Sequence, residues 1–194
     1  MTSVKIIVQG YASKTKNIAT SNCVLIIENN TKIIIDPGMD RPELISGLRK
    51  LKLNPQDIDY VVQSHGHIDH SGLVGIFENA ILLDNADQYT FEGGFKSHSG
   101  KVPGTNVQIL RMPGHDPYHC SVLAETNEGF VAVAADVFWW WDEEEQKTDY
   151  DSLMSRIDPY VKNELDLKES REKILKIADY IIPGHGKMFK VERR

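Results

Sequence analysis

Cysteine is scarce in this sequence, with Cys23 and Cys120 the only two among 194 residues. Small proteins stapled by disulfides use far more cysteine, so we expect two reduced, buried thiols. No run approaches the ~20 apolar residues of a membrane span. No basic leader with an apolar stretch precedes the strand-like residues 4–8. We therefore expect neither a disulfide scaffold nor a membrane protein, and predict a cytoplasmic location.

Positive charge is also in short supply, because 22 Lys and Arg face 28 Asp and Glu, a net charge of −6. Proteins that bind long nucleic acids through bulk charge need a basic surface, so this mode of binding is not predicted. Internal repeats and linkers rich in glycine, serine or proline are absent too. The length predicts a single domain over residues 1–194.

The hydrophobic pattern alternates short strand-like runs with helical ones. Strands are predicted over 4–8, 23–28, 31–35, 60–62, 80–83, 107–112, 121–125, 130–134 and 180–182, and helices over 42–52, 73–77, 151–158 and 168–180. Asn29 and Asn30 tolerate positive φ and predict a hairpin turn. Strands in two batches, with helices between and after them, predict an α+β sandwich of two mixed sheets covered by helices.

Histidine and aspartate crowd into one segment directly after the predicted strand 60–62. The segment reads His65-Gly66-His67-Ile68-Asp69-His70. Zinc readily takes imidazole nitrogen and carboxylate oxygen as ligands, and residues two apart on an extended backbone share a face. Three histidines so close together are poor core material. The segment therefore predicts a metal site.

Four weaker motifs accompany this cluster, each at the end of a predicted strand. They are Asp36-Pro37-Gly38, Pro113-Gly114-His115, Ala134-Ala135-Asp136 and Pro183-Gly184-His185. In this order, from Asp36 to His185, the five motifs resemble the pattern of the metallo-β-lactamase superfamily. The resemblance implies the αββα metallo-β-lactamase sandwich, with a metal site at one edge between the two sheets.

The resemblance also implies a division of ligands that spacing alone does not give. A first metal would bind His65, His67 and His115, a second would bind Asp69, His70 and His185, and Asp136 would bridge them. Two Zn²⁺ per chain are expected, with iron or manganese as alternatives. The two predicted catalytic residues are Asp69, which would orient the nucleophile, and Asp136, the bridge.

Two further residues are expected beside the ligands. Asp36 would orient a ligand histidine, as such carboxylates commonly do, although it could be a turn former instead. His119 lies in a turn resembling that of lactonases, and would either support a ligand or pack as an ordinary polar residue.

An aspartate bridge resembles the glyoxalase II, lactonase and nuclease branches of the superfamily rather than its broad-spectrum lactamases. The chain lacks the second domain of glyoxalase II and the inserted cap of the large RNA-processing nucleases. Its segment 171–191 and the step Asp136-Val137-Phe138 resemble the group of metallo-β-lactamase domain-containing protein 1, which is associated with RNA cleavage.

We therefore predict a dinuclear, zinc-dependent hydrolase that uses a metal-bridging hydroxide on the phosphodiesters of RNA, with promiscuous lactam or ester hydrolysis. One alternative is a thioester, ester or lactone hydrolase acting on a small molecule. A second is a mononuclear iron enzyme resembling the persulfide dioxygenases. No membrane partner is expected, and a homodimer is compatible with the sequence.

Three consecutive aromatic residues, Trp139, Trp140 and Trp141, follow the predicted bridge directly. A loop leaving a metal ligand passes close to the site, so these rings are predicted to form a wall for the substrate. Aromatic faces stack nucleic-acid bases well. The alternative is that one or two rings cap the core or a contact between subunits. The acidic run 142–145 is expected to be a solvated loop.

Overall fold

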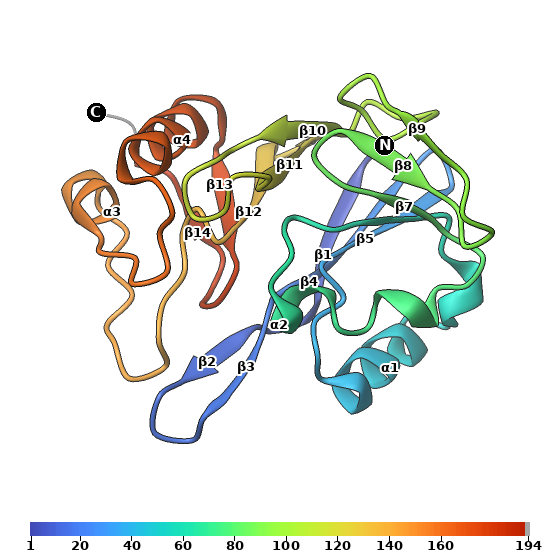
Figure 1. Ribbon diagram of the computed structural model, residues 1–194, viewed down its shortest axis with the longest axis horizontal. Coiled ribbons are helices and arrows are strands. Elements are labelled where there is room, and N and C mark those ends of the chain that lie inside the picture. The colour runs from blue at the N-terminus through green and yellow to red at the C-terminus, as the bar shows by residue number, and fades with distance from the viewer. Residues whose placement is uncertain (193–194) are drawn as a thin grey trace.

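Two β-sheets pack face to face, with helices on both outer faces, in the computed structural model, which describes residues 1–192 (Figure 1). The first sheet has the order β1-β4-β5-β6-β7-β8-β9, and the second has the order β10-β11-β12-β13-β14. A separate hairpin of β2 (Tyr11–Ser13) and β3 (Ile18–Thr20) projects from the body. The predicted αββα sandwich is confirmed.

The strands of the first sheet are β1 (Ser3–Val8), β4 (Cys23–Glu28), β5 (Thr31–Ile35), β6 (Tyr60–Val62), β7 (Ile81–Leu83), β8 (Asp87–Tyr89) and β9 (Phe95–Ser97). Those of the second are β10 (Gln108–Arg111), β11 (Cys120–Thr126), β12 (Gly129–Ala135), β13 (Tyr180–Pro183) and β14 (Phe189–Lys190). The helices are α1 (Arg41–Lys50), α2 (Ile68–Ser71), α3 (Tyr150–Ser155) and α4 (Glu164–Ile177), with 3₁₀ turns at Pro55–Asp57 and Val74–Ile76.

The central strands β4 and β5 are apolar on both faces because both faces are covered. Ile26 and Ile33 point into the core between the sheets. Their neighbours Leu25 and Ile34 point the other way and pack with Leu44 of α1. All five side chains are fully buried, and burying one such side chain stabilises the fold by about 1.5–3 kcal/mol.

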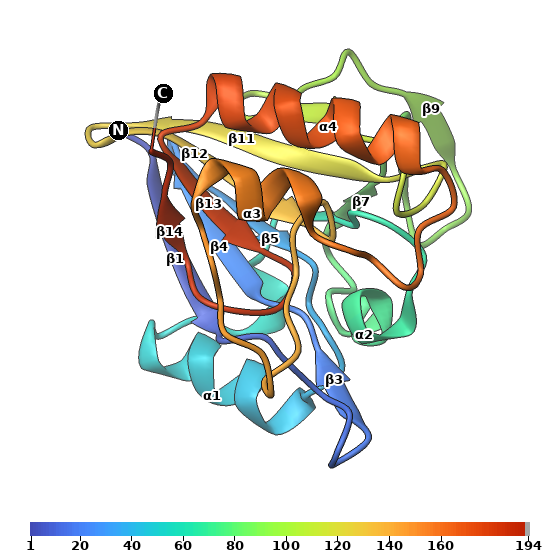
Figure 2. The ribbon, with the colours of Figure 1, turned by 90° about the vertical axis from the view of Figure 1, so that its left-hand side faces the viewer.

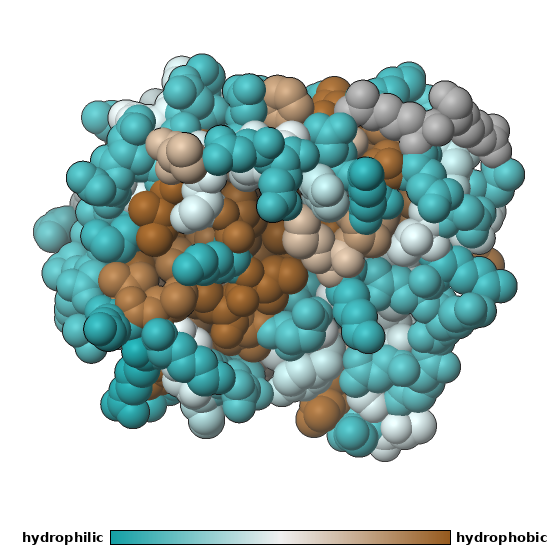
Figure 3. Space-filling view, turned by 180° about the vertical axis from the view of Figure 1, so that it is seen from behind, coloured by the Kyte–Doolittle hydropathy of each residue, from teal (hydrophilic) through white to brown (hydrophobic). Residues whose placement is uncertain are grey.

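Helices α3 and α4 cover the outer face of the second sheet (Figure 2). Asn163 caps α4 by accepting hydrogen bonds from the amides of Leu165 and Asp166, and the apolar face of the helix buries Leu167 and Ile174. The outer face of the first sheet is covered less completely, since Ile7 and other apolar residues there stay partly exposed. An apolar patch is visible when the molecule is seen from behind (Figure 3).

Each strand predicted from the sequence is present, and Asn29 and Asn30 form the predicted turn with φ of 50° and 69°. The helix predicted over 168–180 instead begins at Glu164, because of the Asn163 cap, and the helix predicted over 73–77 is a 3₁₀ turn. The strands β2, β3, β8, β9 and β14 were not predicted, since two or three residues show no usable alternation. Within residues 1–192, no helix combines the length and apolar character needed to span a bilayer.

Candidate metal centre

The predicted site residues all lie where strands end, at one edge of the two sheets. Strands β5 and β6 are parallel, so Asp36 and His65 leave the first sheet side by side. Strands β12 and β13 are also parallel, so Asp136 and His185 leave the second sheet in the same way. The short helix α2 carries Asp69 and His70, and His115 follows β10. The topology therefore brings together residues that are up to 149 positions apart, from 36 to 185.

The first group of candidate ligands comprises His65, His67, His115 and Asp136, whose nitrogen and oxygen atoms all lie within 4.8 Å of one another. Nε2 of His115 is 3.1 Å from Nδ1 of His67 and 3.3 Å from Oδ2 of Asp136. Nε2 of His65 is 3.8 Å from the same oxygen. Ligand atoms about 2.0–2.1 Å from a tetrahedral zinc stand about 3.3 Å apart, so this spacing suits one ion.

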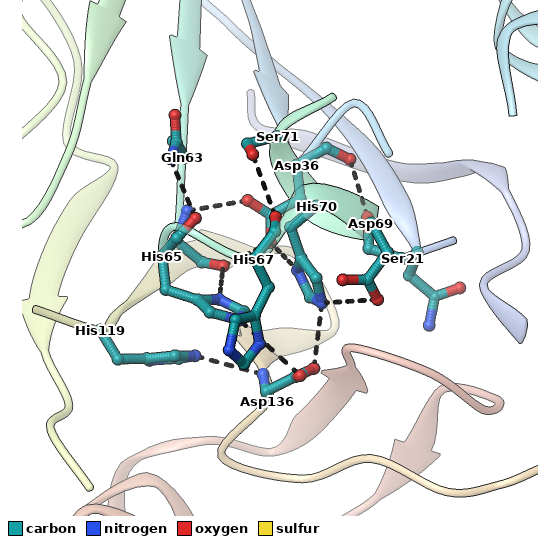
Figure 4. A network of polar contacts seen from close by, with 12 residues as sticks. Ser21, Asp36, Gln63, His65, His67, Asp69, His70, Ser71, His119 and Asp136 are labelled. Carbon is teal, nitrogen blue, oxygen red and sulfur yellow. Dashed lines mark hydrogen bonds and ion pairs between the residues drawn. The ribbon is translucent and has the colours of Figure 1, made fainter. Parts of the chain in front are cut away.

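The second group comprises Asp69, His70 and His185. Oδ2 of Asp69 is 3.1 Å from Nε2 of His185 and 3.8 Å from Nε2 of His70. Oδ1 of Asp136 lies 3.2 Å from Nε2 of His70, whereas its Oδ2 faces the first group. The two oxygens of this carboxylate thus point at different clusters, the orientation of a bridging ligand (Figure 4).

Three polar atoms at the centre of the site are buried and make no hydrogen bond within residues 1–192. They are Nε2 of His65, Nε2 of His70 and Oδ1 of Asp136, the last two of which lie 3.2 Å apart as an ion pair. Buried polar atoms in proteins nearly always form hydrogen bonds. A donor set of imidazole nitrogens and carboxylate oxygens, aimed at one another without hydrogen bonds, fits divalent metal ions such as zinc.

Asp36 supports two of the histidines. Its Oδ2 lies 2.8 Å from Nδ1 of His70 and 2.6 Å from Oγ of Ser64, and its Oδ1 accepts a hydrogen bond from the Ser64 amide. Oγ of Ser64 in turn lies 2.9 Å from Nδ1 of His65. These contacts fix the rotation of both rings, so that the Nε2 atoms point at the candidate metal positions.

Asp158 supports His115, and nothing in the sequence pointed to it. Its Oδ2 lies 2.6 Å from Nδ1 of His115, and both side chains are 1% exposed. It follows α3 in a segment with no motif, 43 positions away from its partner. Only its type, a carboxylate before a proline, could have drawn attention to it.

The segment around His185 is held by backbone and amide contacts. Nδ1 of His185 lies 3.1 Å from the carbonyl oxygen of Tyr11 and 3.0 Å from that of Thr20. Nδ2 of the buried Asn22 side chain donates hydrogen bonds to the carbonyl oxygens of Pro183 and Gly186 at 2.8 and 2.9 Å. The start of the chain therefore positions a candidate ligand near its other end.

His119 contacts the backbone of the predicted bridge. Its Nε2 accepts a hydrogen bond of 3.2 Å from the Asp136 amide, and the ring is fully buried. Burial, helped by the charge of His115, lowers the pKa of His119 to about 3. The ring is therefore neutral near pH 7 and can accept this bond.

Opposite charges meet at the centre of the site. Burial works to lower the pKa of His70, but Asp136 and Asp36 on either side outweigh it and hold that pKa well above its ordinary range. Burial works to raise the pKa of Asp136, but His70, His185 and His65 hold it well below. Burial and the charge of His70 lower the pKa of His65 well below its ordinary value, which leaves the neutral imidazole that metals require.

Each of the two Pro-Gly-His turns needs a glycine because a side chain would collide with a neighbour, and the neighbour differs between the two turns. A Cβ on Gly184 would lie 1.8 Å from Oδ1 of Asp136. A Cβ on Gly114, whose φ is 132°, would lie 2.2 Å from the backbone nitrogen of Leu167 in α4. The first glycine gives room to the candidate bridge, and the second lets α4 approach the loop that carries His115.

A cleft of about 720 Å³ opens beside the candidate ligands Asp69, Asp136 and His185. Most of its remaining wall is apolar or aromatic: Ile18, Ala19, Met39, Pro42, Ile68, Trp139, Trp141 and Tyr160. Within residues 1–192, no lysine or arginine lines it. The cleft therefore offers apolar contact rather than positive charge.

The three tryptophans do not act as one wall, which corrects the prediction for Trp140. Trp139 and Trp141 line the cleft, with ring centroids 4.8 Å apart. Trp140 faces the core instead, where its ring lies 5.9 Å from that of Phe189 and 4.7 Å from the guanidinium of Arg156. The middle ring is therefore turned away from the cleft, toward the core under α3 and α4.

Proteins with similar sequences belong to the family whose motifs this site resembles. The sequence profile described as Metallo-beta-lactamase superfamily matches residues 18–81. Metallo-beta-lactamase domain-containing protein 1 of Xenopus laevis is 30% identical, over 97% of this chain and 82% of that protein. The mouse protein of the same name is 35% identical over 83% of this chain, and the match spans 62% of its length. Hydroxyacylglutathione hydrolase GloC of Haemophilus influenzae is 28% identical over 85% of each chain.

A solved structure described as a metallo-beta-lactamase from Thermotoga maritima has the same fold. It superposes with a TM-score of 0.72 at 22% identity, over 97% of this chain and 99% of the other. The fold, the order of the motifs and the similarity to these relatives agree. The chain belongs to the metallo-β-lactamase superfamily of metal-dependent hydrolases, in the group of metallo-β-lactamase domain-containing protein 1.

Proposed function

We propose that this protein is a two-zinc hydrolase of uncharged, largely apolar esters, thioesters or lactones. Two observations together carry the proposal. Two clusters of candidate ligands are faced by different oxygens of Asp136. The cleft beside them is mostly apolar and has no lysine or arginine among its described lining residues. When bound, a pair of divalent metals supplies activation of water and stabilisation of the negative charge that develops on the attacked group.

Asp69 has the geometry of a residue that orients water. Its side chain is 22% exposed and lines the cleft, whereas that of Asp136 is 6% exposed. Burial works to raise the pKa of Asp69, but the hydrogen bond with His185 and the charge of His70 lower it. The carboxylate is therefore ionised near pH 7 and can accept a hydrogen bond from water.

The wall of the cleft favours an apolar substrate group over a polyanion. Transfer of apolar surface out of water contributes about 25 cal/mol per Å². The partly exposed ring of Trp141 offers such surface in the cleft that Asp69 lines, whereas Trp139, 4% exposed, backs this wall. RNA carries one negative charge per nucleotide, and its binding rests largely on lysine and arginine. RNA cleavage, the function preferred from the sequence, thus has less support than its small-molecule alternative.

RNA is the second candidate because of one feature at the rim. Nζ of Lys14 lies 4.7 Å from the centroid of Trp141, and the ring of Tyr160, 49% exposed, is 6.4 Å from that of Trp141. Exposed rings beside a cation can stack a base and contact one phosphate. This arrangement would suit a short single strand rather than a duplex.

A single preparation tests these proposals. Protein purified without chelator would be analysed for metals and then assayed on an octanoyl ester, a thioester, a lactone, a cephalosporin and single-stranded RNA. We expect about two zinc ions per chain and faster turnover of the ester, thioester or lactone than of RNA. RNA cleavage that is lost in Asp69→Ala, without ester or lactone turnover, would transfer the function to phosphodiesters. One iron per chain with oxygen consumption would indicate the dioxygenase alternative.

A further inference from the structure

The tip of the β2–β3 hairpin and the loop that begins at Trp141 meet at the rim of the cleft, whereas the base of the hairpin, at Tyr11 and Thr20, contacts His185. The hairpin contributes Tyr11 and Ile18 to the lining, and the loop contributes Trp141. The hairpin projects from the body of the protein (Figures 1 and 2). Its turn, residues 14–17, is exposed, and its strands have three residues each. A two-stranded hairpin this short is marginally stable by itself.

One carboxylate of the acidic run joins the hairpin turn to the loop. Oε1 of Glu143 accepts hydrogen bonds from Oγ of Ser13 at 2.6 Å, and from Oγ1 and the amide of Thr15 at 2.7 and 3.1 Å. Its Oε2 accepts from the amide of Lys14 at 3.3 Å. Four donors of the turn thus converge on a single side chain, which we call the Glu143 latch.

The neighbouring residues extend the same junction. The amide of Asp142 donates to the carbonyl oxygen of Ala12 at 2.7 Å, and Oδ1 of Asp142 accepts from the Ala12 amide at 3.3 Å. Both residues are exposed to solvent, as predicted for the acidic run, and they also make specific contacts with the hairpin. The hydrogen bonds with Ser13 and Thr15 lower the pKa of Glu143 to about 2, so the latch accepts as a carboxylate at neutral pH.

We infer that Glu143 is a specificity-determining residue, because the latch fixes the position of the hairpin and thereby the space between Ile18 and Trp141 for an apolar substrate chain. The inference rests on the proposed function for the nature of that chain. Glu143 does not line the cleft. It acts through the tip of the hairpin. The base of the hairpin contacts Nδ1 of His185 through Tyr11 and Thr20, so the metal site needs its own control in the test.

The first test is the mobility of the hairpin in the metal-loaded protein. Amide hydrogen exchange of residues 13–20 would be compared in wild type, Glu143→Ala and the control Glu145→Ala, which removes the same charge from an exposed side chain that pairs with Lys147. We expect exchange to rise on the order of tenfold in Glu143→Ala, since short exposed elements open locally. No rise is expected in the control. Equal exchange in all three proteins would overturn the latch.

The second test measures the binding of inhibitors of different chain length in the cleft and does not depend on catalysis. Acetohydroxamate and octanohydroxamate share a metal-binding group and differ in chain length, so the ratio of their affinities, measured by calorimetry, reports contacts of the chain. We expect Glu143→Ala to weaken octanohydroxamate about tenfold, equivalent to losing about two buried methylenes, and acetohydroxamate less than about twofold. Equal weakening of both would overturn the role in specificity.

A second variant, Thr15→Val, removes one donor from the opposite side of the latch and should show the same selective loss, to a smaller degree. Circular dichroism would verify that each variant is folded. Neither test requires turnover of a substrate. The role of Glu143 and the proposed hydrolase function can therefore be refuted independently of each other. Selective hydroxamate binding without hydrolysis of any ester would refute the proposed reaction and support the latch. Ester hydrolysis with unselective hydroxamate binding in Glu143→Ala would do the reverse.

Discussion

Replacing Asp158 by alanine should weaken zinc binding at the site of His115. The carboxylate lies 2.6 Å from Nδ1 of His115 in a place where both side chains are 1% exposed. Its removal leaves a buried ring N–H without an acceptor and the ring without an orienting partner. Loss of such a partner lowers metal affinity by about 10–100-fold, which corresponds to about 1.4–2.7 kcal/mol.

Competition with a chromophoric chelator would measure the zinc affinity, and thermal unfolding of metal-free protein would measure stability separately. We expect Asp158→Asn to retain part of the affinity, because the amide oxygen still accepts a hydrogen bond. The control is Glu172→Ala, which removes an exposed charge on α4 that pairs with Lys176. Unchanged zinc affinity in folded Asp158→Ala would refute the reasoning. A loss confined to the stability of the metal-free protein would show that the residue is only structural.

Further predictions concern the bridge, the tryptophans and pH. Asp136→Ala should lower zinc content and abolish hydrolysis, with little change in circular dichroism. Gly184→Ala should also lower zinc content, since the added Cβ would lie 1.8 Å from Oδ1 of Asp136. In urea melts, Trp140→Ala should lower the free energy of unfolding by about 3–5 kcal/mol, whereas Trp141→Ala should cost less because its ring is partly exposed. Zinc content after dialysis should fall as the pH is lowered to about 5, because a histidine must lose its proton to bind metal. His70, whose pKa Asp136 and Asp36 hold well above its ordinary range, competes for protons first; full occupancy at pH 4.5 would contradict this. Sedimentation velocity would determine whether the chain forms a homodimer, which the sequence leaves open.

The sequence predicted the fold and the candidate ligands well because their signals are local. The cluster from His65 to His70 and the Pro-Gly-His turns each occupy a few adjacent residues at strand ends. The strand segments 23–27 and 33–35 are apolar throughout, as strands covered on both faces must be. Such features can be recognised from residues that are adjacent in the sequence.

Asp36 was predicted to orient a ligand histidine, but Asp158 and Asn22 could not be predicted as supporting residues, since their role depends on tertiary contacts alone. Asp158 and Asn22 reach their partners across 43 and 161 positions, and no motif surrounds either of them. The orientation of Trp140 follows from which face of its segment meets the core. Glu143 belongs to an acidic run whose composition indicates only solvent exposure.

The contacts around His185 have a consequence for the order of folding. Its ring contacts the carbonyl oxygens of Tyr11 and Thr20 across 174 and 165 positions, and Gln9 reaches Gly186 across 177. Contacts between such distant residues close large loops and tend to form late. A chain that has formed only its first sheet would hold His65, His67, Asp69 and His70 without their partners from the second. Zinc would therefore bind the finished fold in preference to its precursors, and cellular zinc would favour complete molecules over partly folded ones.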